Sequence, residues 1–186
     1  DGAPATKKKK KLVAVAVTVT DDGPLLLDGV AVLRTSVAEA FAKSDAYDVA
    51  FVAFVSARVS RETRAALTWL GFSEILEKAL PINVSAIEGK TLREKWATDN
   101  ARKGGCCGAW ELLKLYAWTL TRYHRVVHVD VDCLMLQPID DVLDEDAALV
   151  YTSDYNMMHA RQRANPKIAP AVQGGFLVVR PDASVF

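Results

Sequence analysis

Residues 12–20, with the sequence LVAVAVTVT, constrain the fold more than any other stretch of the chain. They are apolar or β-branched almost throughout, which is typical of a strand that is buried on both faces within a parallel sheet. Residues 21–24 (DDGP) follow directly and have the composition of a turn. We therefore expect a buried strand that ends in a polar loop.

The remaining segments predict alternating strands and helices. We expect further strands at residues 49–55, 75–76, 126–129, 147–152 and 176–179, and helices at residues 26–43, 60–70 and 109–121. Gly71 ends the second helix at a position where glycine is favoured. Strands that alternate with helices predict an α/β fold, with a mostly parallel central sheet flanked by helices on both faces.

Composition fits one globular domain. The chain has 186 residues, 51% of them hydrophobic, and its 23 basic and 23 acidic side chains leave no net charge. A nucleic-acid-binding protein would need a basic surplus, so we expect no nucleic-acid partner. The longest apolar run, residues 12–17, is far shorter than the roughly 20 residues that span a bilayer, so no transmembrane segment is expected.

The amino-terminal residues differ in composition from the rest. Residues 1–11 contain five consecutive lysines at positions 7–11 and predict a disordered basic leader. The globular domain is then expected over residues 12–186. Three cysteines form neither a disulfide framework nor a zinc-binding spacing.

Asp130 and Asp132 are the strongest candidates for chemistry. They follow the predicted strand at residues 126–129. In an extended chain, side chains two residues apart point the same way, so we expect both carboxylates to lie on one side. Paired carboxylates suit Mg²⁺ or Mn²⁺, and an ion held by two carboxylates keeps positions open for a diphosphate. With 15 aspartates in 186 residues, about one Asp-x-Asp arises by chance. The apolar strand before Asp130 distinguishes this pair from the Asp-x-Asp at residues 144–146, which we interpret as solvated surface.

Other motifs are missing or have ordinary interpretations. The chain contains no Gly-x-Gly-x-x-Gly, no phosphate-binding P-loop and no Gly-x-Ser-x-Gly. His128 lies inside the strand before Asp130 and is interpreted as a packed core residue. Lys114 has two open interpretations: an ion pair with Glu111 one turn away, or a contact with a phosphate.

Several segments together resemble family 8 glycosyltransferases, the glycogenin-like enzymes. The resemblance is most specific over residues 113–123 (LKLYAWTLTRY), which are similar to the family's lysine-leucine-x-x-tryptophan and leucine-threonine-x-tyrosine segments, and over residues 126–136 (VVHVDVDCLML). Residues 139–143 continue it. Residues 19–22 (VTDD) look like the family's first-strand turn, and residues 173–181 look like its asparagine-serine-glycine strand.

The resemblance implies a GT-A fold, a single Rossmann-like domain, that transfers a hexose from a UDP-sugar with retention of configuration. Asp130 and Asp132 would hold Mn²⁺ (or Mg²⁺) against the diphosphate, Lys114 would meet a phosphate or the donor sugar, and Gln173 and Gly174 would face the donor sugar. The residues implied to line the uracil and ribose site are Thr18, Val19, Thr20, Asp21 and Val131.

The sequence departs from the family pattern at Gln173, where asparagine is usual, at Cys133, where threonine is common, and at Pro24, near the position of a tyrosine that often stacks on the base. The family's third metal ligand, a histidine, and its catalytic group would both fall beyond Phe186. We therefore expect a domain truncated at its carboxyl end, with the catalytic residue unassigned.

The resulting prediction is a metal-dependent retaining hexosyltransferase that uses a UDP-sugar, with UDP-glucose and UDP-galactose as first candidates. The acceptor, a glycan or a protein, is not identified. A degenerate family member that binds a sugar nucleotide or a partner protein without turnover is the alternative. A phosphate-transferring enzyme of the doubly wound class would share the paired aspartates but lacks a glycine-rich phosphate loop.

Overall fold

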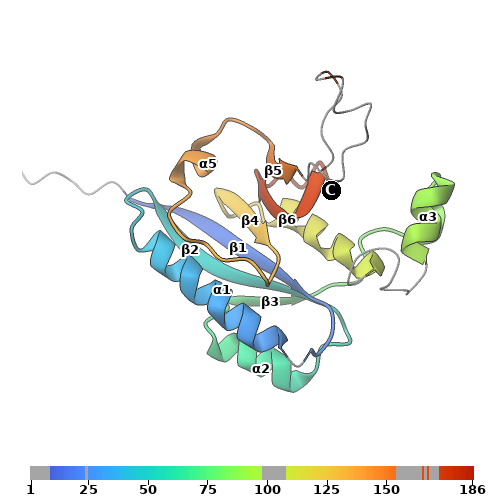
Figure 1. The fold of residues 1–186 in the computed structure, drawn as a ribbon, viewed down its shortest axis with the longest axis horizontal. Helices are drawn as coiled ribbons and strands as arrows, with labels where there is room; N and C mark the ends of the chain where they lie inside the picture. Colours follow the sequence, from blue (N-terminus) through green and yellow to red (C-terminus); the bar gives the residue numbers. More distant parts are fainter. Residues whose placement is uncertain (1–8, 24, 98–107, 154–164, 166, 168–171) are drawn as a thin grey trace, which may run out of the picture.

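A computed structural model describes residues 9–23, 25–97, 108–153, 165, 167 and 172–186. The chain folds into one six-stranded sheet with the strand order β3-β2-β1-β4-β6-β5 and with helices on both faces (Figure 1). The strands are β1 (Lys11–Val19), β2 (Tyr47–Val55), β3 (Glu74–Glu77), β4 (Arg125–Val129), β5 (Leu149–Ser153) and β6 (Val172–Val179). The helices are α1 (Leu26–Phe41), α2 (Arg61–Trp69), α3 (Lys90–Ala97) and α5 (Asp140–Asp144), with 3-10 helices η1 (Val84–Ala86) and η2 (Gly108–Thr119).

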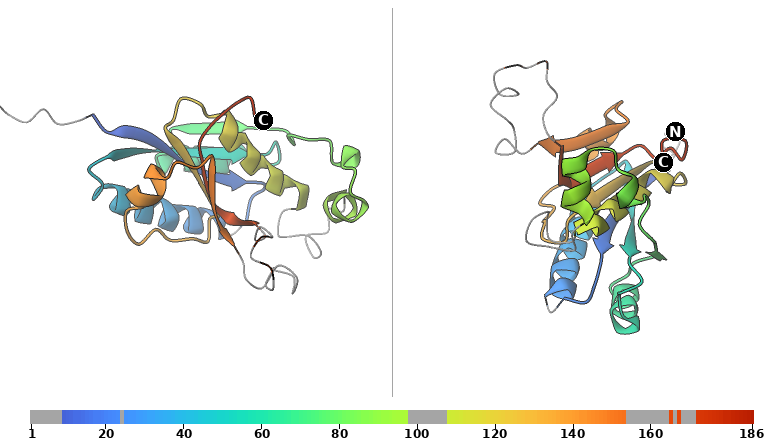
Figure 2. Two further views of the ribbon diagram at one scale, coloured as in Figure 1. Left: turned by 90° about the horizontal axis from the view of Figure 1, so that it is seen from above. Right: turned by 90° about the vertical axis from the view of Figure 1, so that its right-hand side faces the viewer.

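The central strand β1 explains why both faces of the sheet are covered. Its valines at positions 13, 15, 17 and 19 pack with α1 and α2, whereas Ala14 and Ala16 point the other way and pack with η2. Seen from above in Figure 2, α1 and η2 lie on opposite sides of β1. The small alanines let η2 approach the sheet closely. The prediction of a strand buried on both faces is therefore confirmed.

The predicted mostly parallel sheet is also confirmed, with one reversal. Strands β3, β2, β1 and β4 are parallel, but β6 runs antiparallel to both β4 and β5. The sequence expectation included no reversed strand, because an apolar run of this kind carries no sign of strand direction. The reversal brings the start of β6, rather than its end, to the carboxyl end of β4.

The segment predicted as an amphipathic α-helix at residues 109–121 is a 3-10 helix in the structure. Helix η2 buries Leu113 and Ala117 against the sheet. Leu120, which directly follows the helix, packs in the same hydrophobic cluster. Residues spaced three and four apart fit one face of either helix type, so periodicity alone did not separate the two. Helix α3, which was not predicted, packs beside η2 at the edge of the molecule (Figures 1 and 2).

The described part of the chain starts inside the predicted leader. Lys11 is already the first residue of β1, and its backbone N–H donates to the carbonyl of Ala46 (2.9 Å). Residues 1–8 of the leader, Pro24, and the adjacent cysteines at positions 106 and 107 lie outside the described residues. Within the described ranges, no helix is both long and apolar enough to cross a membrane.

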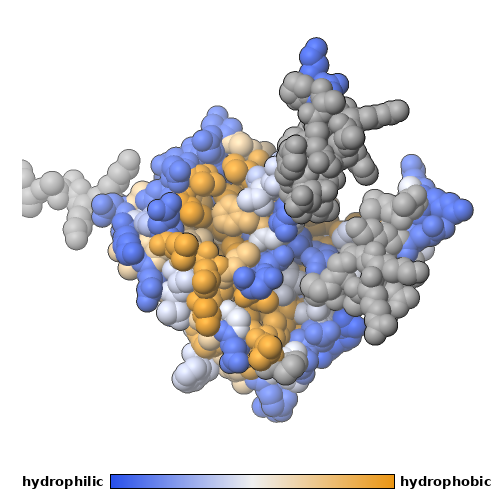
Figure 3. Space-filling model, in the orientation of Figure 1, coloured by the Kyte–Doolittle hydropathy of each residue, from blue (hydrophilic) through white to orange (hydrophobic). Residues whose placement is uncertain are grey.

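One face of the molecule carries apolar side chains that remain accessible. Figure 3 shows them gathered over α1 and the segment that follows β4. Val32 of α1, Leu134 and Leu136 are among the exposed large hydrophobic residues. A cleft of about 310 Å³ lies between Leu33 and the segment that follows β4.

Arg125, at the start of β4, holds the end of α5 and the chain that follows it through hydrogen bonds. Its buried guanidinium donates through Nε to the carbonyl of Leu143 (3.2 Å), through Nη1 to that of Ala147 (2.7 Å), and through Nη2 to that of Glu145. These carbonyls would otherwise lack partners at the end of a short helix.

We expect Arg125→Met to lower the free energy of unfolding by about 3 kcal/mol, because it removes charge-assisted hydrogen bonds to carbonyls that stay partly buried. Arg122→Met is the matched control, since Arg122 is exposed, pairs with Glu74 and lies over the ring of Tyr123; it should cost about 0.5 kcal/mol. Urea denaturation of both variants measures the difference. Equal losses would show that the Arg125 hydrogen bonds contribute no more than a surface ion pair.

Candidate functional site

A cleft of about 290 Å³ lies where β1 and β4 end. The two strands are parallel neighbours, with Ala16 opposite His128, so their carboxyl ends meet at one edge of the sheet. The residues that line the cleft are Thr18, Thr20, Asp21, Gly23, Leu26, Glu111, Asp130, Val131 and Asp132. Segments far apart in the sequence thus form one polar hollow.

Asp130 and Asp132 both line this cleft, one half-buried and the other exposed. The backbone N–H of Asp130 donates to the carbonyl of Gly175 in β6 (2.9 Å), and the carbonyl of Asp130 accepts from the N–H of Cys133 (3.2 Å). These two hydrogen bonds hold the chain as it turns after β4. Both residues lie at the carboxyl end of a central strand, as expected, but residues 131 and 132 form a turn rather than the extended chain that the sequence argument assumed.

Lys114 connects η2 to this pair. Its Nζ lies 2.8 Å from a carboxylate oxygen of Glu111 and 3.7 Å from Oδ1 of Asp130, and it donates to the carbonyl of Gly174 (3.0 Å). The ion pair with Glu111 is therefore present. The ammonium also lies beside the cleft, so the second interpretation, a phosphate contact, stays a prediction.

Burial raises the pKa of the Asp130 carboxyl above its usual range. The Lys114 ammonium opposes this shift, while the carboxylates of Glu111 and Asp132 add to it. Burial also raises the pKa of the Cys133 thiol, and the neighbouring Asp132 and Asp130 raise it further. The cleft thus holds a high density of negative charge beside Asp130, which Lys114 partly neutralises.

Two glycines of β6 make room for these side chains. An ideal Cβ on Gly174 would lie 3.0 Å from Nζ of Lys114, and one on Gly175 would lie 3.0 Å from Oδ2 of Asp130. The register of β6 against β5 shifts at this point, so β6 is irregular where it passes the site. Gln173 turns its side chain back onto its own strand, where Oε1 accepts from the N–H of Gly175.

These residues fit a hard divalent cation. Carboxylate oxygens are the ligands that Mg²⁺ and Mn²⁺ prefer, and because Gly175 lacks a side chain, Oδ2 of Asp130 can lie close to β6. Among the described residues, no third histidine, cysteine, aspartate or glutamate joins Asp130 and Asp132 to complete a cluster of three.

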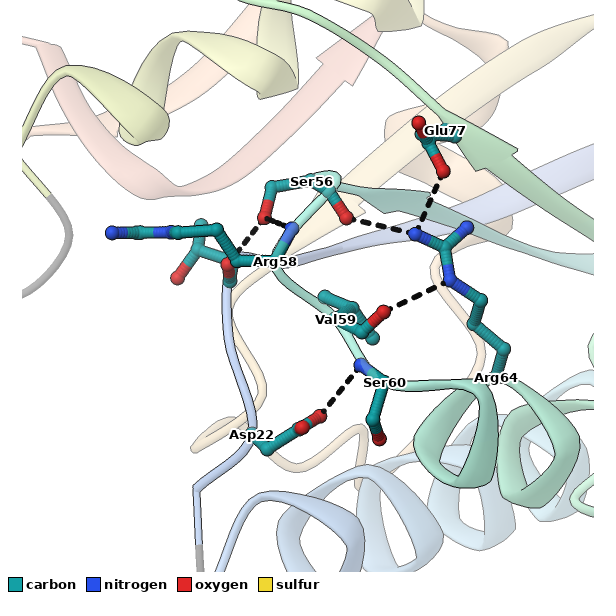
Figure 4. A network of polar contacts seen from close by, with 8 residues as sticks. Asp22, Ser56, Arg58, Val59, Ser60, Arg64 and Glu77 are labelled. Carbon is teal, nitrogen blue, oxygen red and sulfur yellow. Dashed lines mark hydrogen bonds and ion pairs between the residues drawn. The ribbon is translucent and has the colours of Figure 1, made fainter.

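The β1 wall of the cleft is fixed by polar contacts to the loop after β2, which Figure 4 shows. The buried Ser56 hydroxyl donates to the carbonyl of Thr20, and the Ser56 N–H donates to the carbonyl of Val19 (3.1 Å). One residue beyond Asp21, the carboxylate of Asp22 accepts from the N–H of Ser60 (3.2 Å). The end of β1 is therefore held in place before any ligand arrives.

Arg64 of α2 anchors the same loop from the other side (Figure 4). Its Nε donates to the carbonyl of Val59 (3.1 Å), and its Nη2 donates to that of Ser56 (2.9 Å) and pairs with Glu77 (2.9 Å). Arg58, carried by this loop, lies over the ring of Trp110 (5.2 Å) and 3.9 Å from Asp21. Through these contacts the loop after β2 is held to β1, α2, β3 and η2.

The structure brings together most of the residues predicted for a nucleotide-sugar site. Thr18, Thr20, Asp21 and Val131 line the cleft with the two aspartates, although the first strand and Val131 are more than 100 positions apart. Lys114, Gln173 and Gly174 are outside the lining but cluster next to Asp130. Val19 differs: its side chain is fully buried in the core, because alternate residues of β1 face opposite sides of the sheet.

His128 is a core residue, as predicted. It is fully buried in β4, and its Nε2 lies 2.9 Å from Oγ1 of Thr18. Burial, together with the nearby Lys114 charge, lowers its pKa to about 3, so the ring is neutral at physiological pH.

Sequence reasoning missed three lining residues. Gly23 and Leu26 belong to the turn and helix that follow β1, and no polar motif marks them. Glu111 was considered only as the partner of Lys114. Its spacing of three residues from Lys114 on a helix that faces the sheet is the signal that could have placed it in the cleft.

Comparison with solved structures identifies the fold. The galactosyltransferase LgtC, solved in complex with donor and acceptor sugar analogs, superposes with a TM-score of 0.54 and 15% sequence identity, covering 90% of this chain and 57% of LgtC. Mouse xyloside xylosyltransferase 1 in its apo form gives a TM-score of 0.54 and 11% identity, covering 91% of this chain and 66% of that protein. The chain thus has the GT-A fold and spans less than two thirds of each of these glycosyltransferases.

Neither a protein-family model nor a curated protein sequence matches the chain. At such low identity the structural likeness shows the fold alone. Membership of glycosyltransferase family 8 therefore stays a prediction from the sequence motifs.

Arg64→Met should loosen the wall formed by β1. We expect it to lower the free energy of unfolding by about 2 kcal/mol, because hydrogen bonds to two loop carbonyls are lost. Arg61→Met, one turn earlier on the exposed face of α2, is the control and should change it by less than about 0.5 kcal/mol. Hydrogen exchange should rise at the amide of Ser56 in the first variant alone; unchanged exchange there would show that Arg64 does not hold the loop.

Lys114→Met should raise the pKa of Asp130 further, because it removes the positive charge that counteracts burial. Carboxyl carbon NMR of the metal-free protein measures this titration. Lys90→Met, which changes an exposed lysine of α3, should leave it unaltered. A lower Asp130 pKa in Lys114→Met would contradict the electrostatic coupling described above.

Proposed function

We propose that the protein is a metal-dependent glycosyltransferase that transfers a hexose from a UDP-sugar with retention of configuration. The observation that carries the proposal is the meeting of Asp130 and Asp132 with Thr20 and Asp21 in one cleft at the ends of two parallel strands. Sugar nucleotides combine a diphosphate with a nucleoside. Asp130 and Asp132 would face the diphosphate, and the residues at the end of β1 would face the nucleoside. UDP-glucose and UDP-galactose are the donors proposed first.

Asp130 and Asp132 would hold Mn²⁺ or Mg²⁺. When bound, such an ion supplies a Lewis acid that stabilises the departing diphosphate. Without a cation, the carboxylates of the cleft would repel a diphosphate. The raised pKa of Asp130 has the same origin, because burial and neighbouring acids both disfavour its charge.

Lys114 would bind the phosphates or the donor sugar directly. Its ammonium can exchange the carbonyl of Gly174 for a phosphate oxygen, since a lysine carries three donors and a charge-assisted hydrogen bond to phosphate is stronger than one to a neutral carbonyl. Thr18, Thr20, Asp21 and Val131 would surround the uridine. These roles concern donor binding.

Metal-linked binding of UDP tests the proposal. Calorimetric titration should give at least about tenfold tighter UDP binding with Mn²⁺ than without it, because the ion converts repulsion into attraction. Asp132→Asn keeps the side-chain shape but removes a charge, so it should abolish most of that difference.

Asp146→Asn is the matched control, because Asp146 belongs to the other Asp-x-Asp and its side chain is 97% exposed. It should leave UDP binding within about twofold of the unmutated protein. Equal UDP affinity with and without Mn²⁺ would refute the role given to Asp130 and Asp132. Tight binding without release of UDP from any UDP-sugar would favour a binding protein over a transferase.

A further inference from the structure

The hydrogen bond between Thr18 and His128 connects the cleft to the core. Thr18 lines the cleft, whereas His128 is fully buried in the neighbouring strand. Oγ1 of Thr18 and Nε2 of His128 are 2.9 Å apart. Thr18 is β-branched, so its side chain has few alternative rotamers and its hydroxyl oxygen is held in one place. The buried ring therefore acts on the cleft through this hydroxyl.

The surroundings of the ring decide which nitrogen carries the proton. Nδ1 of His128 is buried and has no hydrogen-bond partner within the described part of the chain. A neutral imidazole has one N–H donor and one acceptor nitrogen. A proton on Nδ1 would leave a buried N–H without an acceptor, which is rarer in proteins than a buried acceptor without a donor. The proton therefore belongs on Nε2, which donates to Oγ1 of Thr18.

This assignment fixes the role of the hydroxyl. Because Oγ1 already accepts from His128, its own hydrogen is free to be donated elsewhere, and the described residues offer the Thr18 hydroxyl no second hydrogen bond. We propose that His128 is a positioning residue that sets the Thr18 hydroxyl to donate a hydrogen bond to an acceptor oxygen of the bound sugar nucleotide. The ligand named here rests on the proposed function; the pairing of the two side chains does not.

The proposal has a consequence for specificity. A hydroxyl whose hydrogen has no partner in the protein favours a carbonyl, ribose or phosphate oxygen at that point of the cleft, because such an oxygen can accept that hydrogen. With the opposite tautomer, Thr18 would donate to His128 and could only accept from the ligand. The position of one buried proton thus decides whether Thr18 can donate a hydrogen bond to the ligand.

Nitrogen NMR of the histidine side chains tests the tautomer without any nucleotide. We expect the His128 ring to be neutral, with its proton on Nε2, and a long-lived Nε2–H signal because the ring is buried. The exposed ring of His124 provides an internal comparison. A proton on Nδ1 of His128 would overturn the proposal.

UDP titration in the presence of Mn²⁺ tests the coupling. Thr18→Val and His128→Phe should each weaken UDP binding by about tenfold, the effect of one hydrogen bond. The double variant should be no weaker than the weaker single variant, because both substitutions remove the same contact. His128→Gln, whose amide can donate in place of Nε2–H, should recover UDP affinity to within about threefold.

Two outcomes separate this proposal from the proposed function. Additive losses in the double variant, in a protein that binds UDP, would overturn the coupling of His128 to Thr18 and leave the function standing. Failure of the unmutated protein to bind UDP with Mn²⁺ would overturn the proposed function and the ligand named here, while the tautomer measurement would still report on the pair. Thermal unfolding of His128→Phe and His128→Gln identifies any loss due to misfolding.

Discussion

Parallel strands end at the same edge of a sheet, and β1 and β4 are direct neighbours although 110 positions separate Thr18 from His128. This pairing places the polar exit of β1 against the aspartates that follow β4. The alanines of β1 admit η2 on one face, and its valines receive α1 and α2 on the other. If this strand pair were separated by another strand, neither the cleft nor the hydrogen bond between Thr18 and His128 would exist.

Electrostatics in the cleft follows from this crowding. Three of its acids have cationic neighbours: Glu111 pairs with Lys114, Asp130 lies 3.7 Å from the same ammonium, and Asp21 lies 3.9 Å from Arg58. Asp130 shares Lys114 with Glu111, and burial keeps its pKa raised. A cation and an anionic ligand that bind together would therefore each meet opposite charge, the cation at the carboxylates and the anion at the cation and Lys114. Either one alone would meet both attractive and repulsive charges.

Much of the fold could be predicted because its strands are apolar runs bounded by turn residues. The bounds of β1, β2 and β4 lie within about two residues of the sequence expectation. The direction of β6 could not be predicted, because antiparallel pairing depends on where the chain returns and not on composition. The same holds for the site. Asp130 and Asp132 could be predicted because they follow an apolar strand, but the position of Glu111 in the cleft and the close approach of Asp130 to Gly175 depend on packing that sequence spacing does not encode.

The 3-10 geometry of η2 determines how Glu111 and Lys114 are arranged along the helix. Twelve residues with a rise of about 2.0 Å each extend about 24 Å, whereas the same residues in an α-helix would extend about 18 Å. Residues three apart eclipse one another in a 3-10 helix, so Glu111 and Lys114 project in line, and an α-helix would rotate them apart by about 60°. The pitch of this one helix thus aligns the Lys114 ammonium with the Glu111 carboxylate, with which it forms an ion pair at the edge of the cleft.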